Sequence, residues 1–373
     1  MTDLITPITM PKFGLAMTEG KIAGWNIAPG GHVDAGQEIA DIETTKITNG
    51  YESPASGTLR RQIAEEGETL PVGALLGVLA EPAVSDADID AFIAKFQADF
   101  SSDSTGTEQD DHSEPVLLSV GDLTLRVLDA GQGDSTPLLF IHGFGGDLGN
   151  WMLNQPAFAT NRRTVAFDLP GHGGSSKNVG DGKPATFAAT AAALLDKLDI
   201  AKAHIVAHSL GGAIALELAK AFAPKVASLT LIAPAGLGQD INMDFIEGFI
   251  TADRRKTLEP VLNYLVHDKT LISRKMVEDI IRFKRLDGAV QGLQTIAQSC
   301  FPGGQQADDL RPVLEGFAGP AQIIWGADDE ILSSNSAKDL PEAITVLILA
   351  QTGHMPQLEK AADVNEAITK IVG

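Results

Sequence analysis

The sequence predicts two folded domains of different class. Residues 1–81 are expected to form a β-sandwich or flattened β-barrel, and residues 115–373 an α/β domain with a mostly parallel central sheet and a helical cap. Two observations predict this: an internal repeat of glycine and apolar residues in the first part, and apolar strands alternating with helical segments in the second. A chain of 373 residues also has room for two or three domains of about 150 residues.

The repeat relates two halves of the first domain by a constant offset of 37 residues. Its first copy recurs position by position in its second copy: Gly30, Val33, Gly36, Ile39 and Ile42 become Gly67, Leu70, Gly73, Leu76 and Leu79. Glycines mark turns and the apolar residues mark strands, so we expect two similar β-halves that face each other.

Residues 82–114 differ in composition from both domains, with nine acidic residues and a single lysine, Lys95. Their second part, SSDSTGTEQDDHSE, is typical of a flexible acidic linker. The earlier part, DADIDAFIAKFQADF, has apolar residues at helical spacing and predicts a possible short helix, which packs on one of the chain's own domains or docks elsewhere. Treated as flexible coil, the 33 residues would span roughly 30 Å.

The second domain begins with LLSVGDLTLRVL, which predicts a hairpin that turns at Gly121-Asp122. Six later stretches, LLFIHG, TVAFDL, HIVAHS, SLTLIAP, AQIIWG and TVLILA, predict buried strands. Helical patterns such as TFAATAAALLDKLDI and GGAIALELAKAF separate them, which indicates a mostly parallel sheet. Residues from about 238 to 314 interrupt this rhythm with amphipathic helical segments and predict an inserted cap.

Composition restricts the classes of function. The net charge of −21 argues against a protein that binds nucleic acid or an anionic membrane, since both need a basic surface. The first residues lack a signal-peptide pattern, and no apolar run reaches the roughly 18 residues of a membrane span. The lone cysteine, Cys300, fits a reducing compartment. We therefore expect a cytoplasmic protein with no nucleic-acid or membrane partner and no metal centre.

Lys46 lies in the string IETTKIT, between the two repeat halves and just before Asn49-Gly50. Together with MPKFGLAMTEGKI and SPASGTL, this string resembles the lipoyl domains across the first 80 residues. The resemblance implies lipoate covalently attached to Lys46, and hence a lipoate-attaching enzyme as a partner. Thr45 replaces the aspartate that is more usual before the lysine, and neither neighbour of Lys46 is the methionine typical of biotin domains.

The sequence VAHSLGG follows a predicted strand and precedes a predicted helix, which is the context of a nucleophile elbow, G-x-S-x-G. Ala207 replaces the first glycine. Ser209 is the candidate nucleophile and needs an adjacent base. The base should come last in chain order, and His354 follows the final predicted strand. We expect an oxyanion hole made by the N–H groups of Phe144, in LFIHGFGG, and Leu210.

These motifs, with FDLPGHGGSS, resemble the α/β-hydrolase family. The resemblance implies a triad acid in a Trp-Gly-x-x-Asp pattern, which selects Asp329 in WGADDEIL, with Asp328 as the alternative. His142, Asp168 and His172 are interpreted as structural, and a place for His208 in the site wall stays open. We expect no role for the remaining histidines: His32, His112, His204 and His267.

The fusion of both parts resembles the acyltransferase component of acetoin-cleaving dehydrogenase systems. That resemblance implies transfer of acetyl from the lipoyl group to coenzyme A. It also implies two partner enzymes: a thiamine-diphosphate-dependent enzyme that cleaves acetoin and a dihydrolipoamide dehydrogenase. The His-x-x-x-Asp-Gly motif and the small subunit-binding domain of the 2-oxo-acid dehydrogenase acyltransferases are absent from the sequence. Partner docking should therefore differ from theirs.

Coenzyme A needs cationic contacts for its phosphates. Residues 254–285 contain nine basic and four acidic residues, and we single out Arg254, Arg255 and Lys256 as possible coenzyme A contacts. A solvated helical face would give the same pattern. Two other functions stay open at this point: a lipoyl-tethered hydrolase that cleaves an ester, a thioester or a carbon–carbon bond, and a non-catalytic lipoyl carrier or scaffold.

Overall fold

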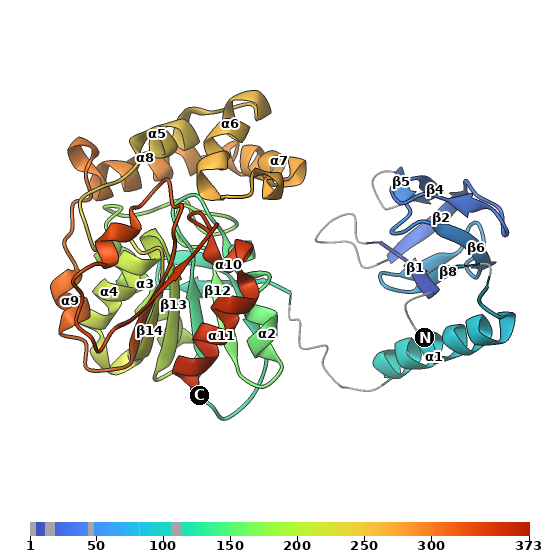
Figure 1. Cartoon of the computed structure of the whole chain (residues 1–373), viewed down its shortest axis with the longest axis horizontal. Helices are drawn as coiled ribbons and strands as arrows, with labels where there is room; N and C mark the ends of the chain where they lie inside the picture. Colours follow the sequence, from blue (N-terminus) through green and yellow to red (C-terminus); the bar gives the residue numbers. More distant parts are fainter. Residues whose placement is uncertain (1–4, 12–18, 44–47, 82, 106–113) are drawn as a thin grey trace. The chain divides into compact units, whose positions relative to one another are not determined.

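The structure, a computed structural model, describes residues 5–11, 19–43, 48–81, 83–105 and 114–373. The chain divides into two compact units, Met1–Asp110 and Asp111–Gly373 (Figure 1). Lys46 and His112 lie outside the described residues.

The strands of the first unit are β1 (Ile5–Thr9), β2 (Glu19–Trp25), β3 (His32–Val33), β4 (Glu38–Glu43), β5 (Thr48–Glu52), β6 (Gly57–Gln62), β7 (Thr69–Pro71) and β8 (Leu75–Ala80). Those of the second are β9 (Val116–Val120), β10 (Leu123–Ala130), β11 (Leu138–Ile141), β12 (Thr164–Phe167), β13 (Ala203–His208), β14 (Val226–Ile232), β15 (Ala321–Gly326) and β16 (Thr345–Leu349).

The α-helices are α1 (Asp86–Thr105), α2 (Gln155–Ala159), α3 (Pro184–Lys197), α4 (Leu210–Ala221), α5 (Met243–Thr251), α6 (Arg255–Leu262), α7 (Arg274–Lys284), α8 (Ala289–Cys300), α9 (Arg311–Glu315), α10 (Pro356–Glu359) and α11 (Ala361–Val372). The short 3-10 helices include η2 (Leu148–Trp151) and η5 (Lys269–Leu271).

The first unit contains two four-stranded sheets, in the orders β1-β8-β6-β3 and β5-β4-β2-β7. The repeat seen in the sequence has a backbone basis. Gly30 and its repeat partner Gly67 have φ values of 89° and 87°, and Gly36 and Gly73 have values of 81° and 85°. This left-handed region favours glycine, so each repeat half makes its two turns at equivalent positions. The apolar repeat positions that follow these turns, such as Ile42 and Leu79, lie in the buried core.

Helix α1 packs on the first unit. Ile89 is fully buried beside Leu75 and Val78 of β8. At its first turns, Asp86 and Asp90 form ion pairs with Arg60 and Arg61 of β6. The sequence predicted a short helix here without deciding what it packs on. The helix is 20 residues long and belongs to the first unit. The reach of roughly 30 Å expected for 33 residues of coil is therefore wrong, because most of the segment is helical.

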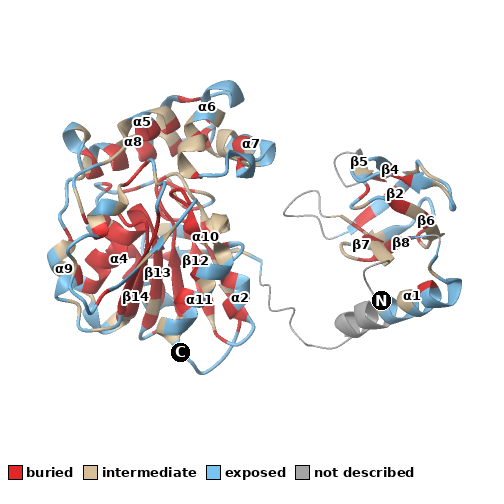
Figure 2. Cartoon of the chain, viewed as in Figure 1, coloured by how far each residue is buried: buried red, intermediate tan, exposed pale blue. Residues whose placement is uncertain are grey.

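The second unit is an eight-stranded sheet in the order β16-β15-β14-β13-β11-β12-β10-β9. Its strands β11 to β16 run parallel, while β10 is antiparallel to β9 and to β12. The predicted hairpin is confirmed, and Gly121 adopts a φ of 57° at its turn. One apolar cluster contains α3 and α4, and a second contains α11 and η2; the central strands are almost wholly buried (Figure 2). This arrangement brings the carboxyl ends of the parallel strands to one edge of the sheet.

One predicted strand differs from its expected environment. TVLILA contains β16, which is one of the two edge strands of the sheet and is not buried. Val346 and Ile348 are 38% and 45% exposed. An apolar run in a sequence predicts a strand but cannot show whether a neighbouring strand covers its outer side.

Helices α5 to α8 form a layer beyond the carboxyl ends of the strands (Figure 1). They fall within the predicted cap. Their inward residues, among them Phe245, Phe249 and Leu293, belong to the main core cluster. In the described part of the chain, no helix is long and apolar enough to cross a membrane. Within the same residues, no cluster of histidine, cysteine and acidic side chains has the makings of a metal site.

Candidate active site

Ser209 sits in a sharp turn between β13 and α4. Its φ of 56° and ψ of −121° are unusual for a non-glycine residue, and strain of this kind is typical of a nucleophile elbow. The turn is held by backbone hydrogen bonds: Ser209 N donates to Ile232 O at 3.0 Å, and Ser209 O accepts from Ala235 N at 2.9 Å. The serine is thereby fixed at the carboxyl edge of the sheet.

The elbow is so closely packed that its glycines cannot carry side chains. A Cβ added to Gly211 would lie 2.4 Å from Ile141 O, and one added to Gly212 would lie 2.5 Å from Pro234 Cβ. A Cβ on Gly143 would lie 2.8 Å from Ser209 Cβ. The glycines after the serine are therefore required by packing, whereas the turn accommodates Ala207 in place of the first glycine of the motif.

His354 and Asp329 approach each other from loops after β16 and β15. His354 Nδ1 lies 2.8 Å from Asp329 Oδ2, with side chains 2% and 0% exposed. The carboxylate is held by three further donors: Trp325 Nε1 at 2.9 Å, Ile331 N at 2.8 Å and Leu332 N at 3.0 Å. A buried carboxylate with this set of donors can orient the imidazole and stabilise its protonated form.

Asp328, the alternative acid, points elsewhere. Its side chain is 47% exposed, and its Oδ2 lies 2.9 Å from His267 Nδ1. The geometry therefore favours Asp329. His354 and Ser209 line one cavity, which leaves the Nε2 side of the histidine for exchange of a proton with the serine.

Phe144 and Leu210 supply two backbone N–H groups next to Ser209. Leu210 is the first residue of α4, where N–H groups have no partner within the helix and the helix dipole is positive. Across the residues that the structure describes, neither the Phe144 nor the Leu210 N–H has a hydrogen-bond acceptor. They are therefore available to an oxyanion that forms beside the serine.

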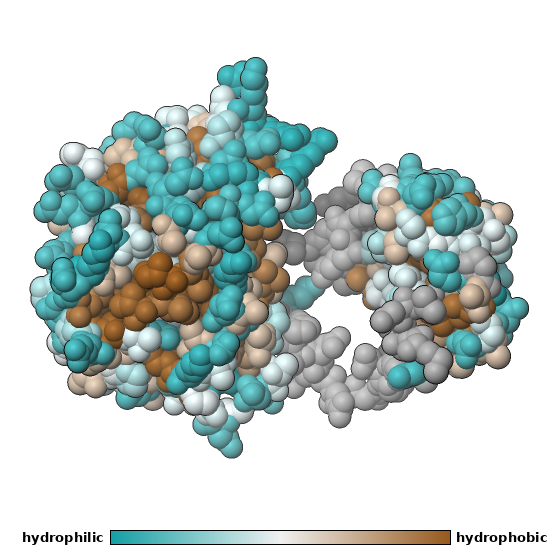
Figure 3. All heavy atoms as spheres, viewed as in Figure 1, coloured by the Kyte–Doolittle hydropathy of each residue, from teal (hydrophilic) through white to brown (hydrophobic). Residues whose placement is uncertain are grey.

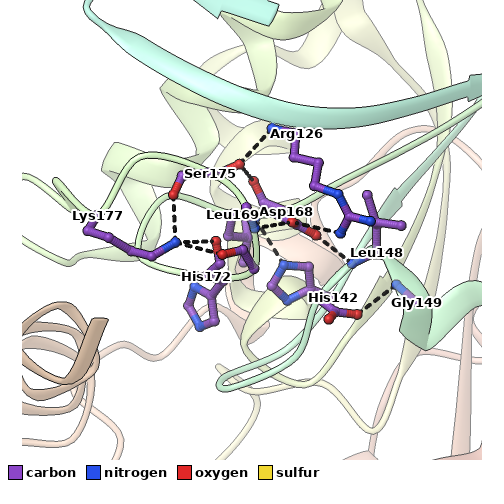
Figure 4. Close-up of polar contacts among 12 residues, drawn as sticks. Arg126, His142, Leu148, Gly149, Asp168, Leu169, His172, Ser175 and Lys177 are labelled. Carbon is purple, nitrogen blue, oxygen red and sulfur yellow. Dashed lines mark hydrogen bonds and ion pairs between the residues drawn. The ribbon is translucent and has the colours of Figure 1, made fainter. Parts of the chain in front are cut away.

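The loop after β11, which carries Phe144, is held by a buried polar network around Asp168 (Figure 4). The Asp168 carboxylate accepts from Leu148 N at 2.8 Å and Gly174 N at 2.7 Å, and pairs with Arg126 at 3.3 Å. His142 Nε2 accepts from Leu169 N at 2.9 Å. These contacts act on the backbone and support the structural interpretation of Asp168 and His142.

His172 belongs to the same network and directly contacts the loop after β11 that carries Phe144. Its Nε2 accepts from Gly145 N at 3.1 Å, while Nδ1 donates to Pro170 O at 3.1 Å. Burial lowers the pKa of His172 to about 3, so the ring stays neutral and can accept that bond. Lys177 stabilises the segment that contains His172 by donating to the carbonyl oxygens of His172, Gly173 and Ser175.

His208, the residue before the nucleophile, lies in the wall of the cavity. Its Nε2 donates to His354 O at 2.8 Å, and the two rings lie 4.8 Å apart. Burial holds the pKa of His208 well below its usual range. The residue is thus a neutral support for the His354 backbone.

Above Ser209 lies a cavity of about 480 Å³, within the usual size range for ligand pockets. The cap contributes most of its apolar lining: Phe245, Phe249, Leu265, Leu271, Met276, Ile280 and Phe283. No pattern in the sequence separates these residues from ordinary core positions. The lining fits a hydrocarbon chain better than a polar substrate.

The one basic residue that lines this cavity within the described chain is Lys275, on α7. It pairs with Asp279 at 2.6 Å, and Arg282 contacts the same carboxylate at 3.1 Å. Arg254, Arg255 and Lys256 do not line the cavity. Arg254 and Arg255 pair with Asp253 and Glu259 on the outer surface. The sequence analysis selected these three residues by their charge, and charge does not show which side of α6 faces the cavity.

Two other histidines of the second unit, His204 and His267, do not line the cavity. His204 Nδ1 lies 2.7 Å from Ser228 Oγ, and His32 is an exposed residue of the first unit. Lys46 is outside the described residues, but the strands on both sides of it are paired, with Glu43 opposite Thr48 and Ile42 opposite Asn49. The segment with Lys46 therefore joins the adjacent ends of β4 and β5.

Comparisons with known proteins agree with both units. Residues 6–79 match the family described as "Biotin-requiring enzyme", and residues 136–361 match "alpha/beta hydrolase fold". A variant of the meta-cleavage product hydrolase of Pseudomonas fluorescens shares the hydrolase fold, with a TM-score of 0.62 and 20% identity over 70% of this chain and 97% of its own.

Two curated relatives span the whole chain. The dihydrolipoyllysine-residue acetyltransferase component of the acetoin cleaving system of Pseudomonas putida is 45% identical, with 97% of both chains covered. The corresponding component of Cupriavidus necator is 41% identical over 100% of this chain and 99% of its own. With its lipoyl domain and its α/β-hydrolase-fold domain, the chain therefore belongs to the family of dihydrolipoyllysine-residue acetyltransferase components of acetoin cleaving systems.

Proposed function

We propose that the chain transfers an acetyl group from a lipoyl group on Lys46 to coenzyme A, and that Ser209 carries the acetyl group between them. The observation that carries this proposal is the site itself. A strained serine, a His354–Asp329 pair 2.8 Å apart and two acceptor-free N–H groups meet at an apolar cavity, in a chain that also contains a lipoyl domain.

In the first half-reaction, the Ser209 hydroxyl attacks the carbonyl carbon of the acetyl thioester and gives its proton to His354 Nε2. Asp329 stabilises the imidazolium that results. The Phe144 and Leu210 N–H groups donate to the oxyanion. The carbon–sulfur bond then breaks, and His354 returns the proton to the departing sulfur. An acetyl ester remains on Ser209.

In the second half-reaction, the thiol of coenzyme A attacks that ester and gives its proton to His354. The bond to Ser209 Oγ breaks, and the oxygen takes the proton back. A thioester enters and a thioester leaves, so neither an oxidant nor a reductant is needed.

Lipoate on Lys46 supplies a dithiol on a long hydrocarbon arm, one sulfur of which carries the acyl group. The family match over residues 6–79 and the paired strand ends of β4 and β5 support this attachment site. The apolar lining of the cavity suits the hydrocarbon arm, and the buried position of the triad limits competition from water.

Coenzyme A approaches past α7, where Lys275 and Arg282 share the carboxylate of Asp279. A phosphate group there would meet two cations whose charge is only partly balanced. Arg254, Arg255 and Lys256 belong to the same basic segment and attract the nucleotide from farther out. The lysine at the cavity is the nearer contact.

The enzyme works as part of a multienzyme complex. We assign it three partners: a thiamine-diphosphate-dependent enzyme that cleaves acetoin and loads the arm, a dihydrolipoamide dehydrogenase that reoxidises it, and an enzyme that attaches lipoate to Lys46. The single cysteine, Cys300, is buried, and its pKa is raised by burial to about 12, which suits a protein of the reducing cytoplasm.

The test supplies free S-acetyl-dihydrolipoamide, with and without coenzyme A, and measures acetyl-CoA and acetate. Because the donor is free, formation of acetyl-CoA should need Ser209 and not Lys46. Ser209→Ala should abolish it, while Lys46→Arg should leave it intact. With the acetoin-cleaving enzyme as the acetyl source, both variants should fail. Acetate released at one rate regardless of coenzyme A would make the protein a hydrolase and overturn the proposal.

A further inference from the structure

Strand β16 leaves one side of its backbone without a partner. Within the described residues it pairs only with β15, in parallel, and forms the end of the eight-stranded sheet. In Figure 1 it is the red strand that crosses in front of β14. Figure 3 shows an apolar patch on the same face of the molecule, over this strand. Its outward side chains include Val346, 38% exposed, and Ile348, 45% exposed.

This edge lacks the usual protection against pairing with another strand. Natural edge strands carry a lysine, a proline or a bulge that prevents such contacts. The five residues of β16, TVLIL, contain no charge and no proline, and their register with β15 has no shift. A regular apolar edge of this kind is stable in solution when a second strand covers it.

We propose that β16 pairs antiparallel with β16 of a second copy of the chain, about a two-fold axis at Leu347. The strand is complementary to itself in that arrangement. Val346 of one copy lies opposite Ile348 of the other, and Thr345 lies opposite Leu349. The two exposed side chains project from one face of the sheet, so four aliphatic side chains meet there. No charged residue of the strand faces another.

The other end of the sheet offers an alternative edge. In β9, Val116 is 50% and Leu117 is 64% exposed. Pairing of β9 with β16 of the next copy would be heterologous and would continue into open chains or rings. Pairing of β16 with itself closes at two copies and joins two eight-stranded sheets into one. A dimer of this kind would also provide a core on which the complex assembles. The sequence lacks the small subunit-binding domain that could otherwise organise it.

The test compares two double variants that differ in one residue, in the lipoylated full-length chain, by sedimentation velocity. Val346→Lys with Ile348→Lys places lysines opposite each other across the axis. Val346→Lys with Ile348→Glu places each introduced lysine opposite an introduced glutamate. The first should weaken dimerisation at least about 100-fold, because like charges face each other, while the second should remain dimeric.

Leu117→Lys, on the β9 edge, is the matched control and should stay dimeric. Circular dichroism and the rate of acetyl transfer should not change in any variant, because these residues lie outside the catalytic site. A monomeric wild type would overturn the proposal. So would a dimer that Leu117→Lys dissociates, or a failure of the lysine–glutamate variant to dimerise, since that would exclude the register centred on Leu347.

Discussion

Asp329→Asn removes the charge of the proposed triad acid while keeping its size. The two carboxylate oxygens have different partners. Oδ1 accepts from two backbone N–H groups, and Oδ2 accepts from Trp325 and faces His354 Nδ1. An asparagine has only one oxygen. Its NH2 group must face either the two backbone donors or the indole and imidazole donors. His354 then loses its acceptor at Nδ1 or adopts the other tautomer, with Nε2 protonated and unable to accept the serine proton.

The expected loss in kcat is roughly 10⁴-fold, as when the acid of a serine triad is made neutral. At about 1.36 kcal/mol for each factor of ten, this corresponds to roughly 5.5 kcal/mol of transition-state stabilisation. The assay is acetyl-CoA formation from free S-acetyl-dihydrolipoamide. The KM for the donor should change little, because Asp329 does not line the cavity above Ser209.

Asp328→Asn is the matched control, since Asp328 is exposed and pairs with His267 instead. Its kcat should remain within about threefold of the wild type, because exposed ion pairs contribute little. The thermal transition of each variant is measured alongside, to show that the fold is retained. A loss below tenfold in Asp329→Asn, or an equal loss in Asp328→Asn, would refute the assignment of the acid.

Three further predictions concern the elbow, the oxyanion loop and the cap. Gly211→Ala should lower kcat at least about 100-fold, because the new Cβ would lie 2.4 Å from Ile141 O and displace the serine, whereas Ala207→Gly should stay active; steady-state rates decide this. His172 has a native pKa of about 3, below the value of about 6.5 in the unfolded chain. The contribution of His172 to the free energy of unfolding is therefore complete above pH 6.5. Below that pH the contribution falls by about 1.4 kcal/mol per pH unit towards pH 3, because the unfolded chain binds a proton that the native ring does not. Urea unfolding of wild type and His172→Gln should therefore show a flatter pH dependence for the variant, and parallel curves would contradict the account. Lys275→Glu should raise the KM for coenzyme A about fivefold, the size expected of one exposed charge contact, and leave that for the uncharged donor unchanged; a larger effect from reversal of Arg254, Arg255 and Lys256 would place the nucleotide farther out.

The main features of the fold could be predicted because they depend on short local patterns. Glycines repeated at a constant offset carry left-handed turns, so the repeat itself defines the two halves of the first domain. Ser209, Asp329 and His354 each follow an apolar strand, and parallel strands bring their carboxyl ends together. Order along the chain therefore nominated Ser209, His354 and the adjacent pair Asp328 and Asp329, and the resemblance to α/β-hydrolases selected Asp329 from that pair.

Other features depend on tertiary contacts that the sequence does not display. The partner of α1 is determined by Ile89 and by ion pairs with Arg60 and Arg61, 25 to 29 residues earlier in the chain. Arg255 and Lys275 look alike as cap residues, yet α6 presents one to solvent while α7 brings the other to the cavity. The exposure of β16 depends on its place at the end of the sheet, which no local pattern encodes.

The most direct test of the acyl-transfer account is to look for the acetyl group on the enzyme itself. The protein is mixed with excess S-acetyl-dihydrolipoamide without coenzyme A, quenched in acid and digested, and the peptide with Ser209 is analysed by mass spectrometry. The account predicts one acetyl group on Ser209, absent from Ser209→Ala, that appears as acetyl-CoA when coenzyme A is added before the quench. An unmodified Ser209 under conditions in which acetyl-CoA still forms would contradict it.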